Sequence, residues 1–427
     1  MAQPEALSLR TNMLWSSAGS ITRLACNYLV GVAVVRLSHG FDAAGGLALI
    51  MAIANLINPF ADYRLRTIQV TDTKGERSAG EYVGLRVLTT ALAFVIGVVY
   101  SLATAALNLL PLIAMYLVYS LATNFIEVLH AIDQRHRRMD YIGKSYILQG
   151  VTTLAAFCVV LWLANSLMAA IVAMAVATIL VGVVYDVPRS AQFERLRPVI
   201  DIRPALSLLV TLFPLVIAQV CSSSVLTLPR QYLESSAGSE ALGIYNSVAS
   251  PVVIVQMGAV YVYSPLMGEF ADRFHSTNKR SALALLWRTI GGILVVTAVA
   301  AALLLLLGDP VLRLIFGDKI IGHTDLLLPA IICTVMTAFA WFMNDLLIAV
   351  RDLKAGFLGN ALAAVGSLAS MKALVDAFGM NGVSWVGVLS YALAVALLSL
   401  FLARDYRRLG SQWGGPPPQP SASSAKS

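Results

Sequence analysis

The sequence predicts an all-α protein with about twelve membrane-spanning helices. Three observations favour this fold class. Only 12% of the 427 residues are charged and 58% are hydrophobic, whereas a soluble domain usually carries about 25% charged residues. Apolar stretches long enough to cross a bilayer, roughly 20 residues each, recur along the chain. The lysines and arginines gather in alternate connections between these stretches. Little of the chain is left to form a soluble domain.

The predicted spans fall into two sets of six, separated by a polar stretch. The first set lies near residues 12–37, 41–60, 83–105, 108–128, 145–164 and 167–187. The second set lies near 205–228, 241–266, 282–306, 324–348, 355–375 and 380–403. We therefore predict an N-terminal six-helix lobe, a cytoplasmic linker, a C-terminal six-helix lobe and a disordered cytoplasmic tail. Their boundaries are 1–187, 188–204, 205–403 and 404–427.

The charge distribution predicts the orientation. Most of the 30 lysine and arginine residues fall in connections on the same side as the N-terminus, if every predicted span crosses the membrane. Only Arg230, Arg313 and Lys319 fall in connections on the other side. The positive-inside rule then places both termini in the cytoplasm and requires an even number of spans. The net charge of +7 thus comes from short connections between spans in a lipid bilayer, and no nucleic-acid partner is expected.

The two halves of the chain echo each other. Arg36 ends the first span, and an acidic-Ala-x-Gly run, residues 42–45, opens the second. Arg230 ends the seventh span, and a second run of this kind, residues 240–243, opens the eighth. An even number of spans per half gives both halves the same orientation. Two parallel repeats with a site at their interface are an architecture found in transporters.

Four predicted spans carry polar residues at helical spacing, so each has a polar face. In span one the stripe is Ser16, Ser20, Arg23 and Asn27, and in span seven it is Gln219, Ser223, Thr227 and Arg230. In span four it is Tyr116, Ser120, Asn124 and Glu127, and in span ten it is Thr334, Thr337, Trp341 and Asp345. We expect these faces to turn toward a water-filled cavity or toward each other.

Arg23 is the sharpest candidate for a functional residue, because a central arginine costs roughly 2.5–3.5 kcal/mol to insert. It is either an anion-binding group in a cavity or an arginine paired with a carboxylate for packing. Arg36 and Arg230 lie near an interface, where snorkelling is an alternative to substrate binding. Glu127 and Asp345 are candidates for a gate or an ion site, with solvated helix ends as the alternative.

Several function classes find no support in the sequence. It contains no P-loop, no HExxH motif and no dinucleotide fingerprint. The four cysteines lie in apolar runs and are expected to be buried free thiols. We therefore expect no metal and no cofactor. Catalysis of sugar transfer is also not expected, because the predicted outer loops are short and lack an acidic pair.

Three segments resemble a known family. Residues 34–56 (VVRLSHGFDAAGGLALIMAIANL) resemble the first hairpin of bacterial oligosaccharide flippases, in which an arginine ends the first span and an acidic-x-x-Gly opens the second. Residues 62–76 (DYRLRTIQVTDTKGE) resemble the first cytoplasmic loop of these proteins. Residues 227–251 (TLPRQYLESSAGSEALGIYNSVASP) resemble the outer connection from span seven to span eight. These flippases export O-antigen, capsule and exopolysaccharide precursors and belong to the multidrug/oligosaccharidyl-lipid/polysaccharide exporter superfamily.

The resemblance implies a V-shaped transporter, similar to multidrug-and-toxin-extrusion proteins, in a bacterial plasma membrane. The implied cargo is an undecaprenyl-diphosphate-linked oligosaccharide, flipped to the outer leaflet by alternating access around a cationic cavity. In this cationic cavity Arg23 would hold the diphosphate, and Arg36 and Arg230 would receive it near the outer face. A polysaccharide polymerase is a candidate partner. Three alternatives remain: a cation-coupled multidrug exporter of the same superfamily, a lipid II exporter, or an enzyme such as a membrane glycan polymerase or glycosyltransferase.

Overall fold

The computed structural model describes residues 7–38, 41–72, 77–104, 109–267, 269–270, 273, 279–317, 320, 322–349 and 352–408. Across these residues the secondary structure is helical, with no strand. Eleven described helices are long and apolar enough to cross a membrane. One of them, α9 (Ile202–Tyr263), has 62 residues and is broken at Gly238, where φ is 87°. It therefore supplies two spans, and the predicted total of twelve is confirmed.

The helices of the first half begin and end close to the predicted spans. They are α1 (Leu9–Leu37), α2 (Asp42–Asp62), α4 (Ala79–Thr104), α5 (Leu110–Arg135), α6 (Met139–Ala164) and α7 (Leu167–Val181). The short helix α3 (Leu65–Thr71), between α2 and α4, was not predicted. A π-helical turn, η2 (Gly182–Asp186), continues α7 into the short α8 (Val187–Ser190). After α9, the second half contains α11 (Lys279–Phe316), α12 (Leu327–Ala349), α13 (Leu353–Phe378) and α14 (Met380–Arg408). Of the predicted tail, α14 covers the first residues, and 409–427 lie outside the described residues.

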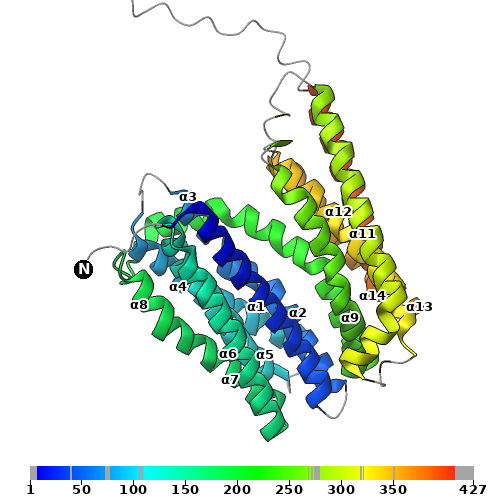
Figure 1. Cartoon of the computed structure of the whole chain (residues 1–427), viewed down its shortest axis with the longest axis horizontal. Coiled ribbons are helices and arrows are strands. Elements are labelled where there is room, and N and C mark those ends of the chain that lie inside the picture. Colours follow the sequence, from blue (N-terminus) through cyan, green and yellow to red (C-terminus); the bar gives the residue numbers. More distant parts are fainter. Residues whose placement is uncertain are drawn as a thin grey trace, which may run out of the picture.

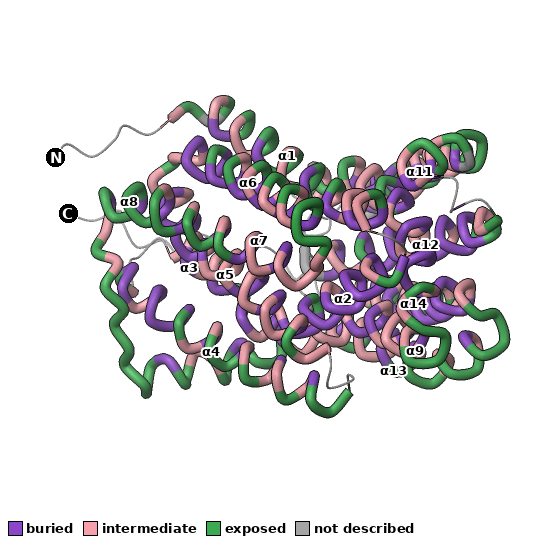
Figure 2. Tube along the Cα trace, turned by 90° about the horizontal axis from the view of Figure 1, so that it is seen from below, coloured by how far each residue is buried: buried purple, intermediate pink, exposed green. Residues whose placement is uncertain are grey.

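The helices form a V with two lobes (Figure 1). Helices α1 to α8 make one lobe, α11 to α14 the other, and α9 runs from the first lobe into the second. The lobes converge where α1 gives way to α2 and diverge toward the end that carries α3 and α8. We call the diverging end the basic side, because most loop lysines and arginines fall there, and the converging end the opposite side. Helix α2 lies buried between the lobes (Figure 2).

The hydrophobic core is shared on one side and divided on the other. The largest cluster of buried residues joins the lobes mainly near the opposite side, where Phe41 belongs to the same cluster as Leu242 and Phe316. Toward the basic side, one cluster surrounds Tyr63 in the first lobe, and a separate one surrounds Phe342 in the second. The protein is therefore closed on the opposite side.

The two copies of the internal repeat contact each other at this closure. Gly45 near the start of α2 lies against the backbone of Ser239, and Gly243 lies against the backbone of Phe41. A Cβ atom on either glycine would overlap the carbonyl oxygen of its neighbour. The two acidic-Ala-x-Gly runs that echo each other in the sequence thus lie side by side and allow α2 and α9 to approach closely.

The predicted lobe boundaries stay a prediction. Residues 195–201 between α8 and α9 have no helical structure, as expected for part of a linker. However, Ala205, Leu212 and Val216 at the start of α9 belong to the core around Tyr63 of the first lobe. The first third of α9 therefore packs with the first lobe, and α9 as a whole also contacts α2 and every helix from α11 to α14.

Candidate functional site

A polar cavity of about 290 Å³ lies within the first lobe, between α1, α2, α5, α6 and α7. Its polar lining consists of Arg23, Asn27, Asn55, Asn58, Tyr116, Tyr119, Ser120, Thr123, Asn124, Glu127, Gln149, Thr153 and Thr178. The Thr178 hydroxyl is buried and has no hydrogen-bond partner within the described part of the chain. The cavity can thus offer one cation and many neutral hydrogen-bonding groups to a polar ligand.

Arg23 reaches this cavity from the middle of α1. Its Nη1 lies 3.3 Å from Oε1 of Glu127, and its guanidinium carbon lies 3.8 Å from the ring centroid of Tyr146. The close fit of α1 on α6 depends on Gly150, where a Cβ would press against the Arg23 backbone. The side chain remains 30% exposed. Arg23 is therefore paired with a carboxylate, as the packing alternative predicts, and still borders open space.

Glu127 is the centre of a charged cluster. Beside Arg23, its carboxylate accepts hydrogen bonds from the guanidinium of Arg66 on α3 and from the Tyr146 hydroxyl at 3.0 Å. Arg66 also donates to the Tyr146 hydroxyl at 2.8 Å and to Gln134 Oε1 at 3.0 Å. Glu127 was predicted as a gate or ion residue. The structure shows it to be the shared partner of two arginines.

A second set of buried titratable groups lies next to Glu127. His130 is fully buried, with Nδ1 3.8 Å from Glu127 Oε2 and Nε2 3.3 Å from Asp186 Oδ1. Asp186 closes the π-helical turn η2, and such turns often mark functional sites. Asp133, also fully buried, accepts from the Ser190 hydroxyl at 3.1 Å. The sequence reasoning missed this set, although Glu127, His130 and Asp133 share one helical face by their spacing.

Asparagines of α2 order the neutral wall of the cavity. Asn58 Oδ1 accepts from the Ser120 hydroxyl at 2.9 Å and from Asn124 Nδ2 at 3.0 Å. Asn124 was expected on the cavity face, whereas Asn55 and Asn58 were overlooked. The available signal was two amides three residues apart in an otherwise apolar span, which places them on one face.

Arg36 lies at the opposite side and joins the two lobes. It ends α1, and its guanidinium donates to the carbonyl oxygens of Leu314 and Ile315, the latter at 2.7 Å. These carbonyls belong to the last turn of α11, which has no partners for them within the helix. A cation at this helix end is also favoured by the helix dipole. In this conformation Arg36 is a contact of the closure and lies outside the polar cavity.

Arg230 lies in the second lobe. It lies near Tyr245 of α9, Cys333 of α12 and Tyr391 of α14. Its Nε is buried and has no hydrogen-bond partner among the described residues. The three arginines predicted to form one cationic cavity are therefore at three separate places in this conformation.

The other predicted site residues also lie outside this cavity. Thr227 donates to the Ala52 carbonyl of α2 at 3.4 Å, which links the lobes. Asp345 accepts from the Tyr263 hydroxyl at 3.1 Å within the second lobe. Ser16, Ser20, Gln219, Ser223, Thr337 and Trp341 are likewise absent from its lining. The structure brings together Arg23, Asn27, Asn124 and Glu127.

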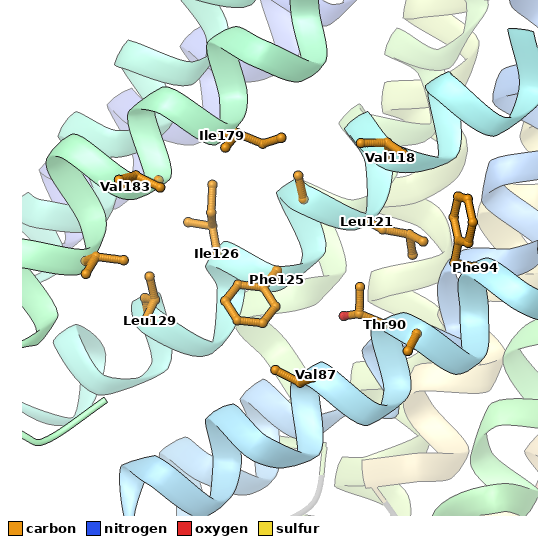
Figure 3. Close-up of a pocket in the computed structure, with 14 residues that line it drawn as sticks. Val87, Thr90, Phe94, Val118, Leu121, Phe125, Ile126, Leu129, Ile179 and Val183 are labelled. Carbon is orange, nitrogen blue, oxygen red and sulfur yellow. The ribbon is translucent and has the colours of Figure 1, made fainter. Parts of the chain in front are cut away.

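An apolar pocket of about 510 Å³ lies on another face of α5, between α4, α5 and α7 with η2 (Figure 3). Phe125 and Leu129 of α5 line it together with Phe94 of α4 and Val183 of η2. Val183 is exposed, so the pocket opens to the surface of the lobe. Helix α5 therefore separates the polar cavity from an apolar surface that suits lipid.

Comparisons with known proteins agree with this architecture. Residues 45–271 match the family described as polysaccharide biosynthesis protein. The capsular polysaccharide biosynthesis protein CapF of Staphylococcus aureus is 22% identical over 324 residues, 74% of this chain and 79% of CapF.

Solved structures share the fold at lower identity. The lipid II flippase MurJ, in an inward closed conformation, matches with a TM-score of 0.72 and 12% identity, over 93% of this chain and 90% of MurJ. The MATE transporter VcmN of Vibrio cholerae, in a bent form, matches with a TM-score of 0.59 and 15% identity, over 94% and 97% of the two chains. The predicted V-shaped transporter fold is confirmed.

Proposed function

Because this chain belongs to the polysaccharide biosynthesis protein family, we propose that it is a flippase for a polyprenyl-diphosphate-linked oligosaccharide. It moves this cargo from the cytoplasmic to the outer leaflet of a bacterial plasma membrane during synthesis of a surface polysaccharide. The observation that carries the proposal is Arg23, a guanidinium in the wall of a polar cavity inside a transporter fold.

The cavity has the chemistry that this cargo requires. A diphosphate needs cationic partners in a poorly hydrated site, and the planar guanidinium donates to phosphate oxygens in pairs. The amides of Asn27, Asn58 and Asn124 suit sugar hydroxyls. The polyprenyl chain stays in the lipid, because removing it from the bilayer would expose apolar surface to water.

The arrangement of the lobes supports alternating access. With the basic side in the cytoplasm, a V that is closed on the opposite side receives cargo from the cytoplasmic leaflet. Release requires the contacts of Arg36 and of the glycine pair Gly45 and Gly243 to break while the basic side closes. Rocking of two repeats around a central site is a known route for transporters.

A multidrug exporter of the same superfamily remains the closest alternative. Export of cations calls for an available carboxylate in the cavity. The Glu127 carboxylate is engaged by Arg23, Arg66 and Tyr146, and α1 contributes Arg23 to the cavity in place of an acid. A lipid II exporter differs from our proposal only in the glycan, and the likeness to MurJ concerns the fold.

The first test replaces Arg23 by alanine in the host. Cells with R23A should lose surface glycan and accumulate lipid-linked oligosaccharide, because the diphosphate loses its cation. The matched control is R288A, which removes an exposed arginine within α11. Membrane levels of both variants are compared by immunoblot. Normal glycan export with R23A contradicts the role of Arg23. A deletion strain that is sensitive to drugs but makes normal surface glycan favours the multidrug exporter.

A further inference from the structure

The cargo site is already occupied by a side chain of the protein. Glu127 Oε1 lies 3.3 Å from Nη1 of Arg23, on the guanidinium that borders the cavity. A diphosphate that binds Arg23 takes the place of this carboxylate, because both are anions with the same hydrogen-bonding needs. Binding of cargo therefore removes one of the cations that balance Glu127.

The surroundings of Glu127 leave few other ways to balance its charge. The cluster holds three guanidinium groups from α1, α3 and α4, which are Arg23, Arg66 and Arg86. It holds acidic groups from α2, α5, α6 and η2, which are Asp62, Glu127, Asp133, Asp140 and Asp186. Asp140 is already paired with two further cations, Arg138 and Lys144, so it does not draw on the three arginines. The hydroxyls of Tyr146 and Ser190 complete it. An added dianion makes this buried cluster more negative, and burial of uncompensated charge is costly.

His130 and Asp186 have free buried atoms that can accept a proton. Within the described residues, Nδ1 of His130 and Oδ2 of Asp186 have no hydrogen-bond partner, although both side chains are almost completely buried. His130 lies between Glu127 and Asp186, with its ring 5.0 Å from that of Tyr146. A proton at this position is shared among an imidazole and two carboxylates.

We propose that binding of an anionic diphosphate at Arg23 is coupled to uptake of one proton by the group formed by Glu127, His130 and Asp186. The proposal rests on the flippase function and adds a proton-binding site to it. The proton comes from the aqueous solution and replaces the charge of Arg23 that the cargo engages. By linkage, a lower pH then strengthens cargo binding, since each ligand increases the affinity for the other.

Calorimetry on the full-length protein in nanodiscs tests this coupling. The probe is a short-chain prenyl-diphosphate-linked N-acetylglucosamine. It is a diphosphate diester with no group that titrates near neutral pH, so protons taken up on binding must go to the protein. Titration in buffers of different ionisation enthalpy gives the number of protons taken up. We expect up to one proton per bound probe, with a dissociation constant that rises by up to about tenfold per pH unit.

Two variants should move the affinity in opposite directions. E127Q removes the carboxylate that competes for Arg23, so the probe should bind at pH 8 as tightly as it binds the natural protein at lower pH. H130Q keeps that competitor and removes the imidazole, so fewer protons should be taken up per bound probe, and at low pH the probe should bind more weakly than it binds the natural protein. D376N is the matched control, because Asp376 accepts from Tyr232 at an exposed site in the second lobe.

The outcomes separate this inference from the flippase function. Binding of the probe without proton uptake, and with the same pH dependence in E127Q, overturns the coupling and leaves the function standing. Weaker binding in both E127Q and H130Q also overturns it, because it shows that the cluster only maintains the fold. No binding of the probe to the natural protein overturns both proposals. If a variant fails to fold, the number of protons that the natural protein takes up per bound probe still tests the coupling.

Discussion

At the scale of single residues, arginines of similar appearance in the sequence have different partners. Arg23 shares Glu127 with Arg66 at the polar cavity. Arg36 binds the last carbonyls of α11, and Arg230 lies within the second lobe. Each is an arginine near or inside a span, so residue type and position along the chain do not distinguish them. Their partners come from helices that are distant in the sequence.

Arg86 is a structural arginine within the predicted span 83–105. It is fully buried in α4, and its Nη1 donates to the carbonyls of Ala61 at 2.6 Å and Asp62 at 3.2 Å, at the end of α2. R86A should lower the free energy of unfolding by about 2–3 kcal/mol, because charged hydrogen bonds are lost. Thermal unfolding of the purified protein measures this loss. The exposed R288A should unfold like the natural protein, and an unchanged R86A would contradict the structural role.

At the scale of helices, the contact between α2 and α9 controls the closure of the opposite side. G45A adds a Cβ that overlaps the Ser239 carbonyl, whereas in G46A the added Cβ lies 3.6 Å from the Leu167 side chain, an ordinary contact. We expect G45A to open the opposite side and to reduce transport, with G46A unaffected. A cysteine at Ser239 should then react faster with a membrane-impermeant thiol reagent in G45A. Equal rates in both variants would show that this contact does not maintain the closure.

The helices themselves could be predicted almost completely from the sequence. Apolar length and alternating charge predicted twelve spans. The echo of residues 42–45 in 240–243 predicted an internal repeat, and the structure adds that these two runs meet at the closure. The sequence predicted an outer loop between spans seven and eight. In the structure this stretch is helical and belongs to α9, which is broken only at Gly238.

The site could be predicted only in part. Of the residues in the stripes on spans one and four, Arg23, Asn27, Asn124 and Glu127 line one cavity in the structure, and their roles stay a prediction. The partner of Arg23 could not be read from spacing, because α1 and α5 are separated by more than seventy residues in the chain. Asp186 was not predicted as a site residue. The π-helical turn shifts the helical register, so ordinary helical spacing does not show which face its side chain occupies.

At the scale of the whole molecule, the shared core on the opposite side and the two cores toward the basic side suit a protein that rocks. Contacts within each lobe need not change when the lobes move, whereas the contacts of α2 with α9 must. In the proposed rocking movement, the contacts that must break are few, chiefly those of the glycine pair and of Arg36 with the end of α11.

If the cargo is a diphosphate, as we propose, its charge makes transport sensitive to voltage. An inside-negative potential favours outward movement of anions by roughly 2.3 kcal/mol per charge per 100 mV. Outward movement of two diphosphate charges is therefore favoured by roughly 4–5 kcal/mol per 100 mV. If one proton travels with the cargo, about half of this gain remains. Transport into proteoliposomes should therefore accelerate when a potassium diffusion potential drives anions in the export direction. A rate independent of voltage would contradict movement of a net negative charge.

The central claim is that the cavity around Arg23 moves a diphosphate-linked glycan across the bilayer. Its most direct measurement uses proteoliposomes of the purified protein that carry a fluorescent prenyl-diphosphate-linked oligosaccharide in one leaflet, with a membrane-impermeant quencher to report its arrival in the other. The natural protein should move the lipid and R23A should not, while R288A keeps the natural rate. Failure of the natural protein to move the lipid, or equal movement by R23A, would contradict the account.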